Sequence, residues 1–429
     1  MNQPTGDSSR AQDVDFGSLR GTSALTAELT ELMGVVEPAA LVNVILQRGF
    51  AHRATDVHLD PTVSGIRVRF RIDGALQEIV SVPVGLVPHL VSRIKVLCGM
   101  DITEKRLPQD GQITAAQIPG LPRDIRVSSS PTILGERIVL RLMPDGSDFV
   151  TLESLGFDSD QLQVVNRLSN SPYGLLLVVG PVGAGKTTTV YSLLSRLNRS
   201  DRSVITIEDP VERRIPGTNQ IQIDPKTGLH FANALRGALR QDPNTICIGE
   251  IRDPETAQIA CRAATTGVLV LSSLHANNTA SAVDVLRGFG VSSMTIADCL
   301  RGVIAQRLIR LVPADSREEA PATPEECEVL GVSSENPPLL MKGIPQEKNL
   351  FTGFRGRTAI FETLEIDHDL RTAISEGVPA WEIHERNVAR GLTILQESAR
   401  KLVLSGRTAL SEYARLIHDV RTQRHLPSL

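Results

Sequence analysis

A glycine-rich stretch followed by a lysine and three threonines is the clearest chemical signal in this sequence. Residues 180–187 read GPVGAGKT, which fits the pattern G-x-x-x-x-G-K-[ST]. Glycines in such a loop let successive backbone N–H groups turn toward a phosphate at the positive end of the following helix. The residues expected to bind the phosphates are Gly180, Pro181, Val182, Gly183, Ala184, Gly185, Lys186, Thr187 and Thr188.

The lysine and the first threonine give this loop its specific chemistry. Lys186 is expected to reach the β- and γ-phosphates, and the Thr187 hydroxyl to ligate Mg²⁺. A plain glycine turn is the competing interpretation, but the flanking residues argue against it. LLLVV before the loop is typical of a buried strand, and an i, i+3, i+4, i+7 stripe after it predicts a covering helix, formed by Val190, Leu193, Leu194 and Leu197. The sequence therefore predicts a bound nucleoside triphosphate with Mg²⁺.

Each of three later apolar segments ends in a polar side chain. SVITIE ends at Glu208, TICIGE at Glu250, and VLVLSSLH at His275. In a parallel sheet the ligand crevice lies beyond the carboxyl ends of the strands. A carboxylate there can orient an attacking water or hold Mg²⁺. A single strand-end acid is equally well explained as a helix cap or a surface group, but three such strands beside a phosphate loop predict a catalytic site.

The composition is that of an ordinary globular protein. Of 429 residues, 41% are apolar and 22% are charged, with a net charge of −4. This charge balance and the 3% of aromatic residues argue against direct binding of nucleic acid. The N-terminal residues are polar, and no apolar run approaches the length of a membrane span. We expect a cytoplasmic protein without a transmembrane segment.

Patterning along the chain separates a small domain from a larger one. Strands alternate with helices over 159–311, which predicts an α/β fold with a mostly parallel sheet covered on both faces. Short alternating strands over 36–147 predict a smaller α+β domain with a tight turn at Asp73 and Gly74. The other expected segments are a flexible arm at 1–35, a linker at 148–158, an insert at 312–350 and a helical C-terminal region at 351–429.

Several motifs together resemble the GspE/PilB-type secretion ATPases, which drive type II secretion and type IV pilus assembly. TIEDPVE, LRQDPNTICIGEIRDPET and LVLSSLHANN are similar to the motor domain of that family. ATDVHLDP, RFRIDG and DIRVSSSPTILGERIVLRL are similar to its second N-terminal domain. The resemblance runs from about residue 37 to about residue 420. It implies a RecA-like P-loop NTPase domain that hydrolyses ATP, and an N-terminal domain of PAS-like type.

The resemblance also implies roles for five residues. Glu208 matches the acid that positions or activates the lytic water, and Glu250 matches the Walker B acid that acts on Mg²⁺, partly through its waters. His275 matches the histidine that senses the γ-phosphate. Arg126 and Arg141 match small-domain arginines that reach a nucleotide, although without the family pattern they would be interpreted as solvated arginines on a strand face.

Members of this family work as ring hexamers in which two domains rotate against each other. The resemblance therefore implies a homo-hexameric motor, peripheral at the inner face of the bacterial inner membrane, with membrane platform or docking proteins as partners. Two alternatives stay open. One is an ATP-binding, weakly hydrolysing scaffold or regulatory subunit of the same machine, and the other is a P-loop kinase or a DNA-processing ATPase.

The sequence departs from the family pattern at several places. Assembly-type relatives carry two C-x-x-C pairs that build a zinc knuckle in the insert. Here the matching places read LVPADS and KGIPQEK, so no zinc is expected, and the five separated cysteines are expected to be buried thiols. Asn244, Val268 and Asn278 replace groups expected to titrate near the site, which predicts slow hydrolysis. The first N-terminal domain of such ATPases is expected to be missing or reduced to the arm.

Overall fold

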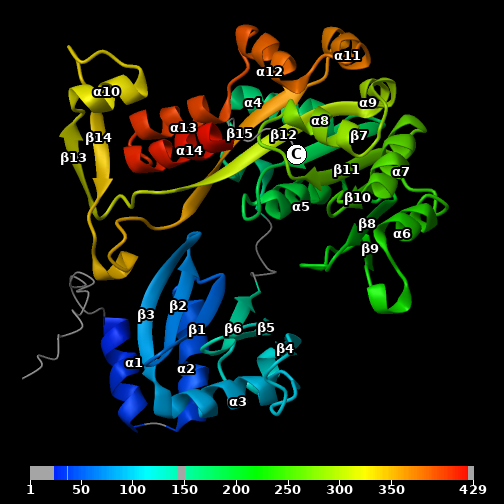
Figure 1. Cartoon of the computed structure of the whole chain (residues 1–429). Helices are drawn as coiled ribbons and strands as arrows, with labels where there is room; N and C mark the ends of the chain where they lie inside the picture. Colours follow the sequence, from blue (N-terminus) through cyan, green and yellow to red (C-terminus); the bar gives the residue numbers. More distant parts are fainter. Residues whose placement is uncertain (1–23, 36, 144–149, 424–429) are drawn as a thin grey trace, which may run out of the picture. The chain divides into compact units, whose positions relative to one another are not determined.

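The chain forms two compact units, each with its own main sheet. The structure is a computed structural model that describes residues 24–35, 37–143 and 150–423. The first unit ends at Leu142 and the second begins at Met143. Figure 1 labels the helices and strands of both.

The first unit is an antiparallel sheet with helices packed on one face. Its strands lie in the order β3-β2-β1-β6-β5-β4, and all neighbouring pairs are antiparallel. Gly49 of α2 lies so close to the sheet that an added Cβ would be 3.2 Å from Val57. The elements are α1 (Ala24–Val35), α2 (Pro38–Ala51), β1 (Asp56–Thr62), β2 (Gly65–Ile72), β3 (Ala75–Pro83), α3 (Val87–Leu97), β4 (Gln109–Ile113), β5 (Ile125–Thr132) and β6 (Gly135–Leu142).

Alternation along β1 divides its side chains between the two faces of this sheet. Val57 and Leu59 are fully buried on the helix-covered face, whereas Asp56, His58 and Asp60 point to the opposite face. The tight turn predicted between β2 and β3 is present. Asp73 and Gly74 both have positive φ, at 50° and 86°, which is typical of a two-residue hairpin turn.

The second unit is built on a seven-stranded sheet in the order β15-β12-β7-β11-β10-β8-β9. All neighbouring pairs from β12 to β9 are parallel, and β15 is antiparallel to β12. The strands are β7 (Gly174–Val179), β8 (Val204–Glu208), β9 (Asn219–Gln222), β10 (Thr245–Ile248), β11 (Leu269–Leu274), β12 (Leu300–Arg310) and β15 (Arg357–Glu365).

Helices cover both faces of this sheet, so its interior strand β7 is buried throughout. Leu177 and Val179 of β7 join the apolar core that includes α7 and α9, while Leu176 and Val178 join the core that includes α4 and α5. This is the pattern of a doubly covered parallel sheet, and it confirms the predicted fold class. The helices are α4 (Ser159–Ser169), α5 (Lys186–Leu197), α6 (Phe231–Ala238), α7 (Pro254–Thr265), α8 (Ser281–Gly288), α9 (Ser293–Cys299), α11 (His368–Ser375), α12 (Ala380–Ala389), α13 (Leu395–Leu404) and α14 (Leu410–Gln423).

Two segments differ from their expected description, and a third has defined secondary structure. Residues 24–35, expected within a polar arm, form helix α1, in which Leu25 and Leu29 are buried; residues 1–23 lie outside the described residues. The C-terminal region, expected to be helical, begins with strand β15, whose consecutively buried residues complete the main sheet beside β12. The insert has its own elements, β13 (Arg317–Pro321), α10 (Pro324–Leu330) and β14 (Leu339–Gly343).

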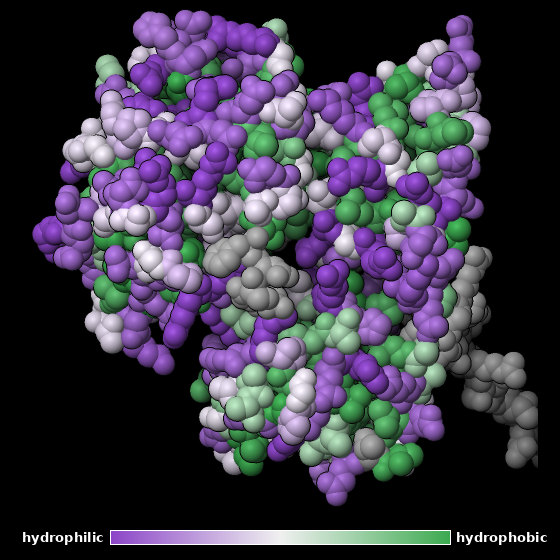
Figure 2. Space-filling view, turned by 180° about the vertical axis from the view of Figure 1, so that it is seen from behind, coloured by the Kyte–Doolittle hydropathy of each residue, from purple (hydrophilic) through white to green (hydrophobic). Residues whose placement is uncertain are grey.

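Among the described residues, none of the helices combines the length and the hydropathy that crossing a bilayer requires. Hydrophilic and hydrophobic residues are interspersed over the face shown in Figure 2.

Candidate active site

The phosphate loop joins β7 to α5 and turns at three glycines. Gly180, Gly183 and Gly185 have φ of 156°, 78° and 86°, a region that favours glycine. Space is also restricted at two of them, because an added Cβ would lie 2.6 Å from the Gln306 carbonyl oxygen at Gly180 and 2.8 Å from Gln306 Nε2 at Gly185. Helix α5 then begins at Lys186 without a side-chain cap, so the positive end of its dipole faces the loop. The backbone therefore forms an anion cradle.

Lys186 folds back over this cradle. Its Nζ donates to the carbonyl oxygens of Gly180 at 2.8 Å and Pro181 at 3.0 Å. Burial, together with the positive charge of Arg307, lowers the pKa of Lys186 to about 8. A phosphate beside Lys186 would raise this pKa again, because its negative charge favours the protonated amine. Thr187 is exposed beside it.

Two residues of β12, to which no role was assigned from the sequence, lie beside the loop. Gln306 is 1% exposed; its Nε2 donates to the Ala184 carbonyl oxygen at 2.8 Å, and its Oε1 accepts from the Thr189 hydroxyl at 2.7 Å. Arg307 donates to the Asn277 carbonyl oxygen at 3.0 Å. Both reach the loop through the pairing of β12 with β7, a long-range relationship that local spacing does not reveal.

Sheet order explains why the three strand-end residues lie near the loop. Strands β11, β10 and β8 follow β7 across the sheet and run parallel to it. His275 directly follows β11, Glu250 lies two residues after β10, and Glu208 is the last residue of β8. The loop also leaves the carboxyl end of β7. The three residues therefore lie at the same end of the sheet as the loop, with His275 nearest to it, then Glu250, then Glu208. Their roles in catalysis stay predictions.

Glu250 and His275 are in direct contact. His275 Nε2 lies 3.5 Å from Glu250 Oε2, and Arg252 forms an ion pair with the same carboxylate. Burial, followed by the charges of Lys186 and Arg252, lowers the pKa of His275, which favours the neutral imidazole near pH 7. The Thr187 hydroxyl and the Glu250 carboxylate are hard oxygen donors of the kind Mg²⁺ prefers, so these residues fit that metal.

Glu208 has a different environment, since it is only 5% exposed. The Tyr191 hydroxyl donates to Oε2, while Thr206 Oγ1 at 2.5 Å and Gln220 Nε2 at 3.1 Å donate to Oε1. No role was assigned to these three donors from the sequence, although Thr206 opens the TIEDPVE motif. Glu208 is therefore held by neutral hydrogen-bond donors that come from α5, β8 and β9.

Arg126 and Arg141 belong to the first unit, where they are directly opposite each other on β5 and β6. Arg141 forms an ion pair with Asp56, with Nε 3.3 Å from Oδ1, and its side chain is 66% exposed. Both arginines lie on the sheet face that the helices leave uncovered. Their contact with a nucleotide in the second unit belongs to the proposal below.

Two of the three substituted positions do not lie near the site. Asn244 and Val268 precede β10 and β11, so they stand at the amino ends of these strands, whereas the site lies at the carboxyl ends. Asn244 Oδ1 accepts from the Ser203 N–H at 2.7 Å, and Val268 packs against the apolar core. The expectation that both change the surroundings of the nucleotide is wrong. Asn278 does follow β11 at the carboxyl edge, where its Oδ1 accepts from the Ser281 N–H at 2.9 Å.

The two insert segments LVPADS and KGIPQEK lie side by side. Lys348 Nζ lies 2.9 Å from Asp315 Oδ2, and the Ile344 N–H donates to the Ser316 carbonyl oxygen at 2.9 Å. Across the described residues, no group of three or more His, Cys, Asp or Glu side chains is arranged to hold a metal ion. Four of the cysteines are buried free thiols and the fifth, Cys98, is half-buried.

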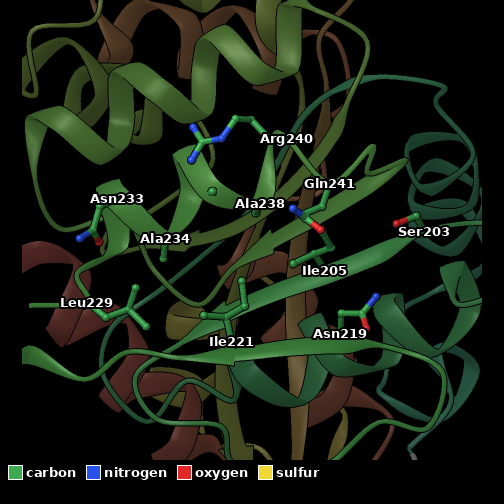
Figure 3. A pocket seen from close by; sticks show the side chains of 11 residues that line it. Ser203, Ile205, Asn219, Ile221, Leu229, Asn233, Ala234, Ala238, Arg240 and Gln241 are labelled. Carbon is green, nitrogen blue, oxygen red and sulfur yellow. The ribbon is translucent and has the colours of Figure 1, made fainter. Parts of the chain in front are cut away.

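A separate pocket of about 560 Å³ lies between strands β8 and β9 and helix α6 (Figure 3). Ile205 and Ile221 line it from the strands, Ala234 lines it from the helix, and Arg240 and Gln241 follow the helix. Its lining includes none of the phosphate-loop or strand-end residues. This pocket is therefore distinct from the candidate nucleotide site.

Comparison with known proteins decides the family. The model of the family described as "Type II/IV secretion system protein" matches residues 33–415. This chain belongs to that family. Type II secretion system protein E of Xanthomonas campestris pv. campestris is 39% identical over 422 residues, which cover 96% of this chain and 71% of that protein.

A second relative belongs to the pilus branch. Type IV pilus assembly ATPase PilB of Thermus thermophilus is 41% identical over 373 residues, which cover 86% of this chain and 42% of PilB. The chain therefore spans less than half of the length of PilB. The solved structure of the pilus retraction motor PilT with bound ADP has a TM-score of 0.58 at 22% identity and covers 87% of this chain and 96% of that one; this likeness supports the fold alone. The resemblance to GspE/PilB-type secretion ATPases is confirmed.

Proposed function

We propose that this secretion ATPase is a motor that hydrolyses ATP to power pilin or pseudopilin assembly in a type II secretion or type IV pilus system. The observation that carries the proposal is the shared edge of the phosphate loop and the strand-end acids, where Glu250 lies 3.5 Å from His275. The names of the relatives support the cellular process, since one is a type II secretion protein and the other a pilus assembly ATPase.

Each side chain at this edge has one task in the proposed reaction. Lys186 and the loop N–H groups bind the phosphates of ATP, and Glu208 positions or activates the lytic water. Thr187 and Glu250 would hold Mg²⁺, which neutralises charge on the phosphates when bound. The neutral imidazole of His275 senses the γ-phosphate through hydrogen bonding.

The arginines of the first unit complete the site. Arg126 and Arg141 supply positive charge to the transition state, a contribution of about 10³ to 10⁵ in rate for arginines of this kind. Because they belong to one unit and the phosphate loop to the other, a change in the relative angle of the two units controls turnover. Hydrolysis is thereby converted into displacement.

The partners follow from this proposed role. The chain assembles as a homo-hexamer and docks on platform proteins at the inner face of the inner membrane. The net charge of −4 agrees with protein partners rather than nucleic acid.

A weakly hydrolysing scaffold is the alternative function. The argument for the scaffold is the loss of titratable groups at three positions. However, Asn244 and Val268 stand at the amino ends of their strands, away from the candidate site. Of the three positions, only Asn278 lies at the carboxyl ends of the strands, where the candidate site is. The motor is therefore the better-supported function.

Phosphate release by the purified full chain with Mg-ATP separates the two functions. We expect release by the wild-type protein and background release by Glu250→Gln. Glu255→Gln is the matched control, because Glu255 is a 59% exposed acid paired with Arg236 on the neighbouring helix. Equal background release by wild type and Glu250→Gln would favour the scaffold.

A further inference from the structure

Tyr191 connects the phosphate-loop helix to the proposed lytic acid. It lies five residues after Lys186 on α5, which corresponds to about 7.5 Å along the helix axis. Its ring is 6% exposed and packs in the apolar core between α5 and the sheet. A buried tyrosine hydroxyl needs a hydrogen-bond partner, and here it donates to Oε2 of Glu208.

The two oxygens of Glu208 are held from different directions. Oε1 accepts from Thr206, two residues earlier on β8, and from Gln220 on β9, whereas Oε2 accepts from Tyr191 on the helix. Rotation of a carboxylate about its last torsion angle is broad and weakly restrained on its own. The Thr206 and Gln220 contacts keep Glu208 in place, and the Tyr191 contact then fixes the plane of the carboxylate.

We propose that Tyr191 is a positioning residue for hydrolysis: its hydroxyl holds Glu208 in the orientation in which the carboxylate acts on water. This inference rests on the proposed function and adds a residue to it. Lys186 and Thr187 form the first turn of the same helix, so the Tyr191 contact joins the helix that follows the phosphate loop directly to Glu208.

Tyr191→Phe separates this role from packing, because it removes the hydroxyl and keeps the ring. Loss of a hydrogen bond to a carboxylate predicts that kcat falls by about 10- to 100-fold. The KM for ATP, the affinity for Mg-ADP and the melting temperature should stay close to wild type, since the phosphate loop and the core are unchanged. Tyr173→Phe is the control, because the Tyr173 ring is at the surface, 4.9 Å from the Arg301 guanidinium; we expect wild-type kcat.

Two results would overturn the inference. One is a wild-type kcat in Tyr191→Phe, and the other is a loss of kcat accompanied by an equal loss of nucleotide affinity, which would indicate a structural role. If Tyr191→Phe does not fold, Thr206→Val removes a donor from the other oxygen at similar volume; a wild-type kcat in that variant would show that the orientation of the Glu208 carboxylate does not limit hydrolysis, which would also overturn the inference.

Wild-type protein and Glu250→Gln are measured in the same assay, so that failure of the inference is distinguishable from failure of the proposed function. Activity of the wild type with an unchanged Tyr191→Phe overturns the inference alone. Background release by the wild type overturns the proposed function and the inference together.

Discussion

Asp56 and Arg141 are direct partners on the neighbouring strands β1 and β6, and their side chains form an ion pair with Arg141 Nε 3.3 Å from Asp56 Oδ1. Asp56 is 8% exposed and also lies 3.5 Å from Arg71 Nε. One buried carboxylate therefore orients an arginine whose own side chain remains 66% exposed. If Arg141 reaches the nucleotide, Asp56 sets the direction from which it does so.

Asp56→Asn should lower ATP hydrolysis by about 10-fold, because the amide keeps the shape but loses the charge that orients Arg141. ATP binding should stay near wild type. Asp60→Asn is the matched control, since Asp60 lies on the same strand between Arg69 at 2.7 Å and Arg137 at 2.8 Å. Equal effects of the two substitutions on steady-state hydrolysis would refute a specific role for Asp56.

Arg126→Ala should cut hydrolysis by about 10³-fold and leave nucleotide binding nearly intact. Arg126 lies directly opposite Arg141, so both present their charge on the same sheet face. Arg67→Ala removes an arginine from that face that lies 3.9 Å from Glu78, and it should have little effect. Unchanged turnover of Arg126→Ala would show that its assignment is wrong.

Nucleotide affinity should weaken as the pH rises through 8. The pKa of Lys186 is lowered to about 8 by burial and by Arg307, and only the protonated amine attracts phosphate. The protonated Lys186 amine therefore contributes fully to nucleotide binding below this pKa. Above this pKa the affinity declines, approaching a tenfold loss for about each pH unit. Calorimetric titration with Mg-ADP between neutral and alkaline pH measures this, and Lys186→Arg should remove the dependence because arginine stays charged. A flat profile for the wild type would contradict the prediction.

Glu412→Gln should destabilise the second unit by about 3 kcal/mol. Glu412 on α14 is 1% exposed and accepts from Arg310 N, Nε and Nη2 at 2.9, 3.0 and 2.7 Å. Burial raises the Glu412 pKa, but the Arg310 hydrogen bonds outweigh it, and the net shift is downward.

The sign of the pH dependence follows from that shift. The Glu412 contribution is present above the usual carboxyl pKa and is lost as the pH falls through the lowered one. Urea unfolding should therefore give a lower free energy of unfolding for Glu412→Gln than for the wild type near neutral pH. This difference should become smaller at acid pH. Glu397→Gln, at a 37% exposed acid paired with Arg400, should change stability by less than about 1 kcal/mol. Equal effects of both variants would contradict this account.

Local pattern was sufficient to predict the elements that carry the phosphate loop. The run LLLVV and the stripe from Val190 to Leu197 are both short-range signals, and they correspond to β7 and α5. The Asp73–Gly74 turn was predictable for the same reason, since two residues determine it.

Relationships across the sheet were not predictable from local pattern. Gln306 reaches the loop only because β12 pairs with β7, and Tyr191 reaches Glu208 at the end of β8 from α5, a helix that packs on β7 and β11. Tyr191 lies in an amphipathic helix, where periodicity alone indicates core packing. Asn244 was expected near the site from its place in the family motif, but β10 lies between Asn244 and Glu250 and places them at opposite ends of the strand.

The central claim is that Lys186 and its loop bind Mg-ATP. The most direct test is calorimetric titration of a non-hydrolysable ATP analogue with Mg²⁺ into the full wild-type chain and into Lys186→Ala near pH 7. We predict one site per chain with a dissociation constant between about 1 μM and about 1 mM, weakened by at least about tenfold in Lys186→Ala. Absence of binding by the wild type at millimolar nucleotide, or equal binding by the two proteins, would contradict the account.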